Sequence, residues 1–387
     1  MKIAFVYDAV YPWIKGGAEK RIFELGKRLA GQGHNVHVFG LKWWDGADVI
    51  MNEGMVLHGV CSRMELYVNG RRSISEAVIF SIKVFPHLIK EKFDVMDVSA
   101  FPYFSCFSAK IVSVIRRNPM VITWHEVWGD YWYEYMGKQG FFGKTVEMMV
   151  SKLSSECIAV SKMTKMGLGS SCKNVDIVPN GIDLEKINNI TPSIYKCDII
   201  FTGRLIKEKN VDMLIEAIVE VKKSLPNVVC HIIGGGPEER RLKGLVANYL
   251  LSDNVKFLGF IDQNELIARF KSSKVMALPS TREGFGMVVL EAFGCGIPVV
   301  TVRYHRNAAC EIVDEETGIV VERDTKELAK ALLKLCNDKK LRDRMAVNVM
   351  EKAKGYDWDL IVENLTSIYG RILKTSDQNT IKGKNFT

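Results

Sequence analysis

The chain has few features that would tie it to a metal, a nucleic acid or an oxidising compartment. Its nine cysteines are scattered, odd in number and form no C-x-x-C pair, so we expect reduced thiols in a cytosolic protein. It has no Lys/Arg-rich block and no aromatic nucleic-acid motif, which argues against a DNA or RNA partner. No His, Asp and Glu cluster has metal-ligand spacing, and we predict no metal site.

Long apolar runs are also missing. No uncharged stretch approaches the ~20 residues that a bilayer-spanning helix needs. The start, "MKIAFVYDAV", lacks the basic residues and cleavage site of a signal peptide and is typical of a first strand. These absences predict a cytoplasmic protein. Lys and Arg outnumber Asp and Glu by 53 to 45, and the formal charge of +8 is compatible with phosphate-bearing ligands or peripheral contact with an anionic membrane.

What the chain does contain is a regular alternation of short apolar runs and longer amphipathic segments. With 387 residues, 47% of them hydrophobic, it is long enough for two folded domains. Strands are expected at 2–8, 35–41, 56–61, 94–99, 120–125, 157–161 and 175–180, and then at 197–203, 228–234, 255–260, 275–279, 298–302 and 317–321. Strand–helix alternation requires parallel pairing with helices on both faces of the sheet. The sequence therefore predicts an α/β protein with two doubly wound, Rossmann-like domains.

The expected domain break lies in "PNGIDLEKINNITPSIYKC", a polar stretch with two prolines and a glycine. We predict a first domain over residues 1–182 and a second over 195–355. A last amphipathic helix is expected over 356–374. Because open parallel sheets bind ligands beyond the carboxyl ends of their strands, the loops after strands are the places to search for chemistry.

The most informative loop is "STREGFGMVVLEAFGCGIPVV", residues 280–300. Gly284 and Gly286 allow a tight turn and a close approach of backbone to a ligand. A helix is predicted to start near Met287, and the free N–H groups at its start favour phosphate or developing negative charge.

Two carboxylates flank this turn. Glu283 precedes the helix and could accept hydrogen bonds from sugar hydroxyls, whereas Glu291 lies among apolar neighbours and needs a polar partner if it is buried. The alternative interpretation makes Glu283 a helix-capping charge and Glu291 a solvated side chain.

Two loops of the second half carry related signals. In "FTGRLIKEKN", Arg204 and Lys209 follow a strand and could hold phosphate oxygens, although a solvated basic loop would have the same composition. In "IIGGGPEER", Gly234, Gly235 and Gly236 end a strand, and Pro237 is predicted at the first helical position. This is not G-x-G-x-x-G, so a tight passage beside a nucleotide is favoured over a dinucleotide site.

The first half has two further candidates. In "DAVYPWIKGGAEK", Gly16 and Gly17 separate a strand from a helix start and form a possible second phosphate cradle. "VITWHEVWGDYWYEY" ends a strand with His125 and continues with aromatic residues. A structural role is the commoner one for such a histidine, and core packing for such aromatics. A stacking wall for an acceptor sugar or lipid is the alternative.

Taken in their order along the chain, these motifs resemble those of the retaining nucleotide-sugar glycosyltransferases of the GT-B fold. This is the group 1 and family 4 type, which includes sucrose synthase-like and bacterial mannosyltransferases. The segments that carry the resemblance are "GGAEK", "PNGID", "GRLIKEKN", "GGGPEE" and "EGFGMVVLEAFGCGIPVV". The resemblance covers nearly the whole chain. It implies two Rossmann-like domains facing across a cleft, with the last helix crossing back to the first domain.

The resemblance also implies roles for individual residues. Glu291 would bind the donor ribose, and Glu283 the donor sugar. Arg204 and Lys209 would hold the diphosphate. The remaining donor-site residues would be Gly16, Gly17, Gly235, Gly284, Phe285, Gly286 and Met287, with His125 near the donor sugar as a catalytic residue. No cofactor and no metal would be needed, since the partners would be a nucleoside-diphosphate sugar and a saccharide or lipid-linked acceptor.

Two departures from the family pattern stand out. Asn210 occupies a position where the family often has glycine. In the altered loop 303–311, the segment "YHRNAACEI", which runs from 304 to 312, replaces the usual Gly-Gly-x-Pro-Glu. The second change affects the expected grip on donor sugar or acceptor.

Three other functions are considered beside a UDP- or GDP-sugar transferase of glycan, glycolipid or polysaccharide synthesis. One is a nucleotide-sugar-binding subunit without catalysis, and another is a GT-B epimerase. A two-Rossmann oxidoreductase would need the dinucleotide fingerprint that this chain lacks. Apolar helices near 76–92 and 103–115 permit a lipid-linked acceptor, but core packing explains them more simply.

Overall fold

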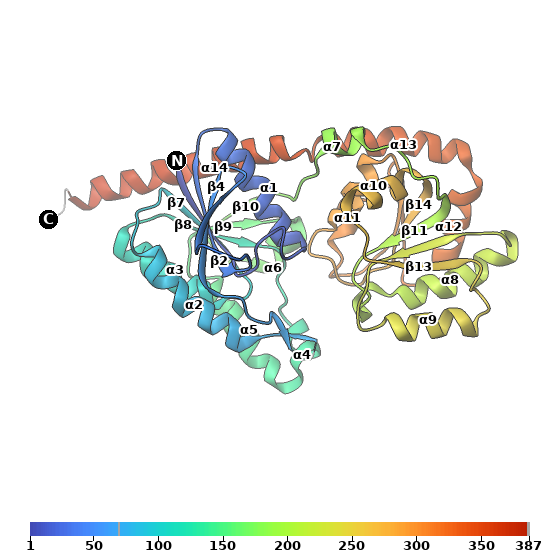
Figure 1. The fold of residues 1–387 in the computed structure, drawn as a ribbon, viewed down its shortest axis with the longest axis horizontal. Helices are drawn as coiled ribbons and strands as arrows, with labels where there is room; N and C mark the ends of the chain where they lie inside the picture. The colour runs from blue at the N-terminus through green and yellow to red at the C-terminus, as the bar shows by residue number, and fades with distance from the viewer. Residues whose placement is uncertain (69, 385–387) are drawn as a thin grey trace. The chain divides into compact units, whose positions relative to one another are not determined.

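The computed structural model describes residues 1–68 and 70–384, and it divides the chain into two compact units (Figure 1). One unit comprises Met1–Asn180 and Trp358–Thr387, and the other comprises Gly181–Asp357. Each is built on its own, largely parallel sheet, which confirms the α/β class and the two doubly wound domains.

The first unit contains an eight-stranded sheet in the order β10-β9-β8-β7-β1-β2-β4-β3. Its strands are β1 (Lys2–Val6), β2 (Asn35–Lys42), β3 (Val49–Asn52), β4 (Met55–Ser62), β7 (Val95–Ser99), β8 (Met120–Trp124), β9 (Glu156–Ala159) and β10 (Asn174–Ile177). All neighbours pair in parallel except β3 and β4, which are antiparallel. A separate two-stranded hairpin joins β5 (Tyr67–Val68) and β6 (Arg71–Arg72).

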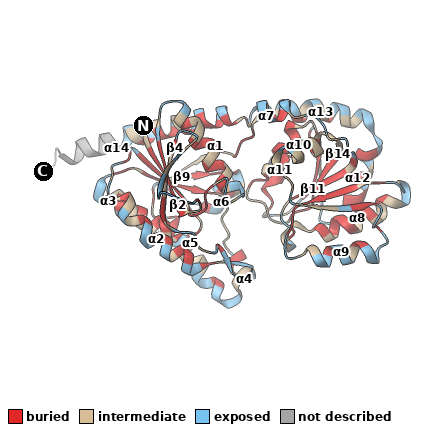
Figure 2. Cartoon of the chain, viewed as in Figure 1, coloured by how far each residue is buried: buried red, intermediate tan, exposed pale blue. Residues whose placement is uncertain are grey.

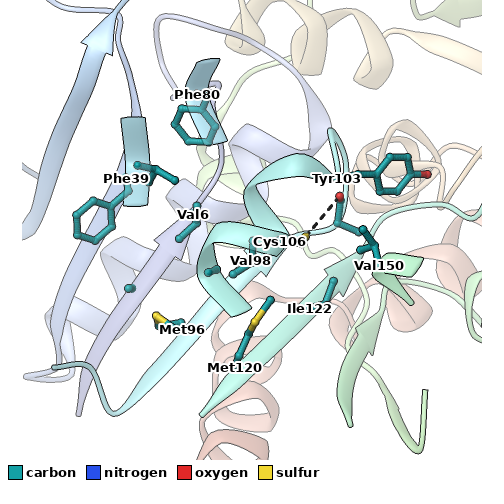
Figure 3. Packing of buried hydrophobic residues seen from close by; sticks show 14 of the residues in the cluster. Val6, Phe39, Phe80, Met96, Val98, Tyr103, Cys106, Met120, Ile122 and Val150 are labelled. Atoms are coloured by element: carbon teal, nitrogen blue, oxygen red, sulfur yellow. Dashed lines mark hydrogen bonds between the residues drawn. The ribbon is translucent and has the colours of Figure 1, made fainter. Parts of the chain in front are cut away.

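Helices cover both faces of this sheet. They are α1 (Gly17–Gly31), α2 (Ile74–Leu88), α3 (Phe104–Arg116), α4 (Tyr131–Met136), η1 (Gly137–Gln139), α5 (Gly140–Val150), α6 (Lys162–Leu168) and α14 (Trp358–Lys384). α2 and α3 pack together, as do α1 and α14. Beneath α2 and α3 lies an apolar core in which Phe80, Val98 and Cys106 are fully buried (Figure 3).

The second unit contains a six-stranded, all-parallel sheet in the order β13-β12-β11-β14-β15-β16. Its strands are β11 (Cys197–Thr202), β12 (Cys230–Ile233), β13 (Val255–Gly259), β14 (Ser273–Leu278), β15 (Val299–Val302) and β16 (Gly318–Val321). Its helical segments are α7 (Leu184–Asn189), η2 (Lys207–Lys209), α8 (Val211–Ser224), α9 (Glu239–Asn248), α10 (Gln263–Lys271), α11 (Met287–Gly294), η3 (Ala308–Glu311), α12 (Thr325–Asn337) and α13 (Lys339–Lys354).

Every predicted strand corresponds to an observed one within a few residues. Elements that the sequence did not predict include β3, whose alternate residues are exposed, and the β5–β6 hairpin. They also include α4 in the aromatic stretch after His125 and α7 in the predicted domain break. The predicted position of Pro237 is also wrong. This residue precedes Glu238, the N-cap of α9, and so lies outside the helix.

The expectation of nine reduced cysteines is wrong for one pair. The structure joins Cys157 and Cys172 in a disulfide, while the other seven are free. The chain path explains the pairing, because β9 and the segment entering the neighbouring strand β10 lie side by side, with Cα atoms 6.5 Å apart. Among the described residues, no helix is both long and apolar enough to cross a membrane.

Candidate functional site

The strand order of the second unit marks a position for ligand binding. From β11 the chain proceeds outward to β12 and β13, then returns to add β14 on the opposite side of β11. This reversal is a topological switch point, and ligands of open α/β sheets bind at the carboxyl ends of strands there. The loops that leave β11 and β14 contain Arg204, Lys209 and Glu283.

The loop after β11 is fastened to the loop after β14 by several hydrogen bonds. The Asn210 side chain donates to the Pro279 carbonyl at 3.0 Å, and the Thr281 N–H donates to the Glu208 carbonyl at 2.8 Å. Asn210 has a φ of +45° in the left-handed region. The residue type that departs from the family pattern thus adopts the conformation that glycine favours, which asparagine tolerates better than most side chains.

The three glycines after β12 let the two neighbouring loops touch through their backbones. A Cβ on Gly234 would lie 2.1 Å from the Gly203 carbonyl oxygen, and one on Gly236 would lie 2.4 Å from that of Leu205. Leu205 also donates its N–H to the Gly235 carbonyl at 2.9 Å. The glycine run therefore fixes the start of the Arg204–Lys209 loop.

The "EGFG" turn leads directly into α11. Gly286 is the N-cap residue and has a φ of +97°, a conformation that favours glycine. A Cβ there would also lie 3.2 Å from the Ala309 side chain. Phe285 is buried, with its ring edge-on to Tyr356 at 6.2 Å between centroids. The predicted start of the helix at Met287 is observed.

Glu283 and Lys209 form an ion pair in which both side chains are largely shielded from solvent. The backbone of Glu283 is held by the altered loop after β15. Its N–H donates to the Arg306 carbonyl at 2.8 Å, and its carbonyl accepts from the Ala308 N–H at 2.9 Å. Asn307 anchors that loop by donating to Val302 and Thr301. The replacement loop thus positions Glu283.

Glu291 lies on α11 and is 5% exposed. Its Oε1 accepts a hydrogen bond from the Gln263 side chain, at the start of α10, at 3.0 Å. A buried carboxylate needs such a donor. The alternative of a solvated Glu291 is excluded.

In the first unit, Gly16 is the N-cap of α1 and Gly17 its first residue, and both are exposed. A Cβ on Gly16 would lie 2.3 Å from a carboxylate oxygen of Glu19, so the Glu19 side chain folds back over the start of the helix. This carboxylate lies at the N-terminus of α1, where the helix dipole favours an anion.

His125 follows β8, with its Nε2 3.5 Å from the Ser99 hydroxyl. Burial, and secondarily the charge of Arg21, lower the pKa of His125 to about 3. The ring is therefore neutral at physiological pH, able to donate or accept a hydrogen bond but not to supply a proton as an imidazolium.

The structure brings Arg204, Lys209, Glu283 and the glycine turns together within the second unit, with Glu291 on the helix that follows. Gly16, Gly17 and His125 belong to the first unit. Sequence reasoning missed Gln263 and Asn307, because an amide after a polar loop has no distinguishing signal. Among the residues described, no group of three or more His, Cys, Asp or Glu side chains lies close enough to hold a metal ion.

Two family models match successive parts of the chain. The model for glycosyl transferases group 1 matches residues 193–352, and that for glycosyltransferase family 4 matches residues 15–186. Among curated proteins, the chain is 23% identical to a component of the phosphatidylinositol N-acetylglucosaminyltransferase of Arabidopsis thaliana, covering 99% of this chain and 84% of that protein. It is 24% identical to alpha-monoglucosyldiacylglycerol synthase of Acholeplasma laidlawii, over 99% of each.

Solved structures have the same fold. The sucrose-phosphate synthase of Thermosynechococcus elongatus matches with a TM-score of 0.79 and 22% identity, covering 97% of this chain and 99% of that one. Anabaena HepE, solved with UDP and glucose, matches with a TM-score of 0.75 and 19% identity, covering 96% of this chain and all of that one.

Proposed function

Because this chain belongs to the glycosyltransferases of the GT-B fold, we propose that it transfers a sugar from a UDP- or GDP-linked donor to an acceptor hydroxyl with retention of the anomeric configuration. The observation that carries the proposal is the cluster at the switch point of the second sheet. There the loops that bear Arg204, Lys209 and Glu283 are hydrogen-bonded to one another and precede the buried carboxylate of Glu291.

The roles follow from the charge that develops as the donor breaks. Departure of the nucleoside diphosphate leaves negative charge on its oxygens, and fixed cations that await this charge lower the barrier. Arg204, Lys209 and the N–H groups at the start of α11 supply such positive charge, and the reaction then needs no metal. The backbone around Gly284, Phe285 and Gly286 contacts the donor, as does Gly235.

The Lys209–Glu283 pair has a specific part in this scheme. Each side chain neutralises the other before the donor binds. When a diphosphate approaches Lys209, one Glu283 oxygen can turn to a sugar hydroxyl while the ion pair still orients the ammonium group. Glu291 binds the ribose hydroxyls, and Gln263 holds that carboxylate in place.

In the first unit, Gly16, Gly17 and the neutral His125 complete the donor contacts in this proposal. The acceptor is a saccharide or a lipid-linked molecule, and the protein works in the cytoplasm in peripheral contact with a membrane. The names of the relatives from Arabidopsis thaliana and Acholeplasma laidlawii, which include phosphatidylinositol and diacylglycerol, favour a lipid. The UDP and glucose bound to Anabaena HepE favour a UDP-sugar.

A donor panel tests the proposal. UDP-, GDP- and ADP-linked sugars are added to the protein, and the midpoint of thermal unfolding is measured, since a ligand that binds only the folded state raises it. The donor that stabilises is then incubated with and without acceptors in the presence of a metal chelator. We expect sugar transfer with the anomeric configuration of the donor, as read by NMR.

Other outcomes identify the rival functions. Stabilisation by a nucleotide sugar without transfer or hydrolysis would support a non-catalytic binding protein. Conversion of the donor sugar with no acceptor present would support an epimerase. An inverted product or a loss of activity in the chelator would contradict the retaining, metal-independent mechanism.

A further inference from the structure

The first unit contains an apolar cavity of about 390 Å³ that the donor chemistry does not use. It opens among four helices: Ile74 and Ala77 come from α2, Phe104 from α3, Trp132 from α4 and Val146 from α5. Its volume lies within the range of small-molecule sites.

The polar atoms of the aromatic wall are engaged elsewhere. Glu147 accepts hydrogen bonds from the Tyr103 hydroxyl at 3.1 Å and the Trp132 indole N–H at 3.0 Å. It also accepts from the backbone N–H groups of Trp128 and Gly129. The Tyr135 hydroxyl accepts from the Arg72 N–H at 2.9 Å. The rings thus line the cavity with their carbon faces, a surface suited to a hydrocarbon.

Exposed apolar side chains surround the mouth of the cavity. Phe142 and Ile74 line it and are 70% and 57% exposed. Further exposed apolar residues lie on α2, α3 and α5, helices that carry exposed residues along their length (pale blue in Figure 2). They are Ile79 and Ile82 on α2, Ile111, Val114 and Ile115 on α3, and Phe141, Met148 and Met149 on α5. We call these residues, with Phe142 and Ile74, the apolar face.

On α2, α3 and α5, the charged side chains that reach solvent are all positive. The acidic residues of α2, α3 and α5 are Glu76 and Glu147, and both are buried. The cationic residues Lys83, Lys110 and Arg116 are exposed or partly exposed, whereas Lys144 is paired with the exposed Asp130 at 2.6 Å. Arg71, at the cavity mouth, is exposed as well. An apolar face bordered by cations is complementary to the interface of an anionic bilayer.

We propose that the apolar face rests on an anionic phospholipid bilayer and that the cavity takes one acyl chain of a glycerolipid. The proposal rests on the proposed function, in that the lipid would present its head-group hydroxyl as the acceptor. The cations hold the protein at the surface, and the aromatic cavity draws one chain out of the bilayer beside the enzyme.

The bilayer contact is tested by sedimentation with vesicles of phosphatidylcholine alone or mixed with phosphatidylglycerol. We expect binding to the mixed vesicles that weakens with salt. The double variant Ile82→Glu, Ile115→Glu should bind at least about tenfold more weakly, because it removes apolar contact and adds negative charge. Val347→Glu is the matched control: Val347, on α13, is as exposed as Ile82, at 64%. Equal binding of both variants would overturn the bilayer contact.

The cavity is tested with a phospholipid that carries a photoreactive group in its acyl chain, followed by mapping of the labelled peptides. We expect labels on α2, α4 and α5 residues of the lining. Val146→Trp fills the cavity and should reduce this labelling about tenfold while vesicle binding is kept. Val114→Trp places the same side chain on the apolar face outside the cavity and should leave the labelling unchanged.

Circular dichroism and the thermal midpoint confirm that each variant is folded. Labelling that Val146→Trp does not reduce, or labelling only by a photoreactive polyprenyl phosphate, would overturn the acyl-chain site. Nucleotide-sugar binding does not enter either readout. Failure of the lipid site is therefore distinguishable from failure of the proposed function.

Discussion

At the residue scale, Arg204 is the side chain whose removal is most informative. Loss of one preorganised donor to developing charge costs roughly 2.7–4 kcal/mol, or about 10²–10³ in rate. We expect Arg204→Ala to lower kcat by about that factor. Steady-state kinetics with the identified donor measure it. Lys207→Ala, an exposed cation in the same loop, is the control and should retain near-normal turnover. An active Arg204→Ala would remove Arg204 from this role.

A second prediction concerns the buried acids beside Arg72. Burial, and then the neighbouring charge of Asp8, raise the pKa of Glu76 to about 8. Folding therefore favours protonated Glu76, so its contribution to stability is present below the unfolded pKa and is lost as pH rises through about 8. Between pH 6.5 and 8 we expect this group to reduce the free energy of unfolding by about 1–2 kcal/mol.

Urea unfolding at several pH values checks this. Glu76→Gln keeps a neutral side chain at all pH values and should flatten the decline. Glu91→Gln is the matched control. The hydrogen bond from Lys2 lowers the pKa of Glu91, which therefore titrates below this window. Identical pH slopes in wild type and Glu76→Gln would contradict the prediction.

The sequence indicated candidate site residues but not the side chains that hold them in place. Glu291 among apolar neighbours indicated a need for a hydrogen-bond donor, but Gln263 lies 28 positions away and only the packing of α10 on α11 brings it close. Asn307 likewise gains its role from the fold, because β14 and β15 are neighbours and their loops pair.

At the element scale, strands that are buried on both faces were predicted because their apolar runs are continuous. All five residues of β7 and of β8 are buried. β3 was not predicted because it is a four-residue edge strand whose alternate residues are exposed. α4 was not predicted because its six residues are mostly aromatic, a composition that does not favour helix. In the structure it is stabilised by packing and by the hydrogen bond from the Trp132 indole to Glu147.

The glycine run after β12 supports a prediction about the neighbouring loop after β11, which it contacts through the backbone. A Cβ at Gly236 would meet the Leu205 carbonyl at 2.4 Å, so Gly236→Ala must displace the loop that carries Arg204 and Lys209. We expect a large loss of affinity for the nucleoside diphosphate of the donor, measured by calorimetry. Gly244→Ala has open space around its Cβ within α9 and should stabilise the protein by about 0.5–1 kcal/mol with unchanged affinity. Normal affinity in Gly236→Ala would show that the loop contact is dispensable.

At the scale of the whole molecule, the last helix belongs to the unit that the chain builds first. α14 buries Trp358, Val362, Leu365 and Tyr369 completely within the first unit. The Tyr369 hydroxyl donates to Asp97 at 2.5 Å, and Arg28 contacts Asp359 at 2.7 Å. Asp97 lies on β7 and is itself buried, with Thr123 as a further donor. The first unit is therefore completed by residues that follow the second unit in sequence.

In a chain that ends at Asp357, the first unit should consequently fail to fold while the second unit still folds. Each fully buried large apolar side chain contributes about 1.5–3 kcal/mol, so losing four removes an amount comparable to the whole stability of a domain. In hydrogen exchange we expect β1 and β7 to lose protection while β11 and β14 keep it. Tyr369→Phe retains the ring and removes one donor to Asp97, so it should cost only about 1–2 kcal/mol. Equal loss of protection in both units would show that α14 stabilises more than the first. Protection of β1 and β7 in the shortened chain would show that the first unit folds without α14.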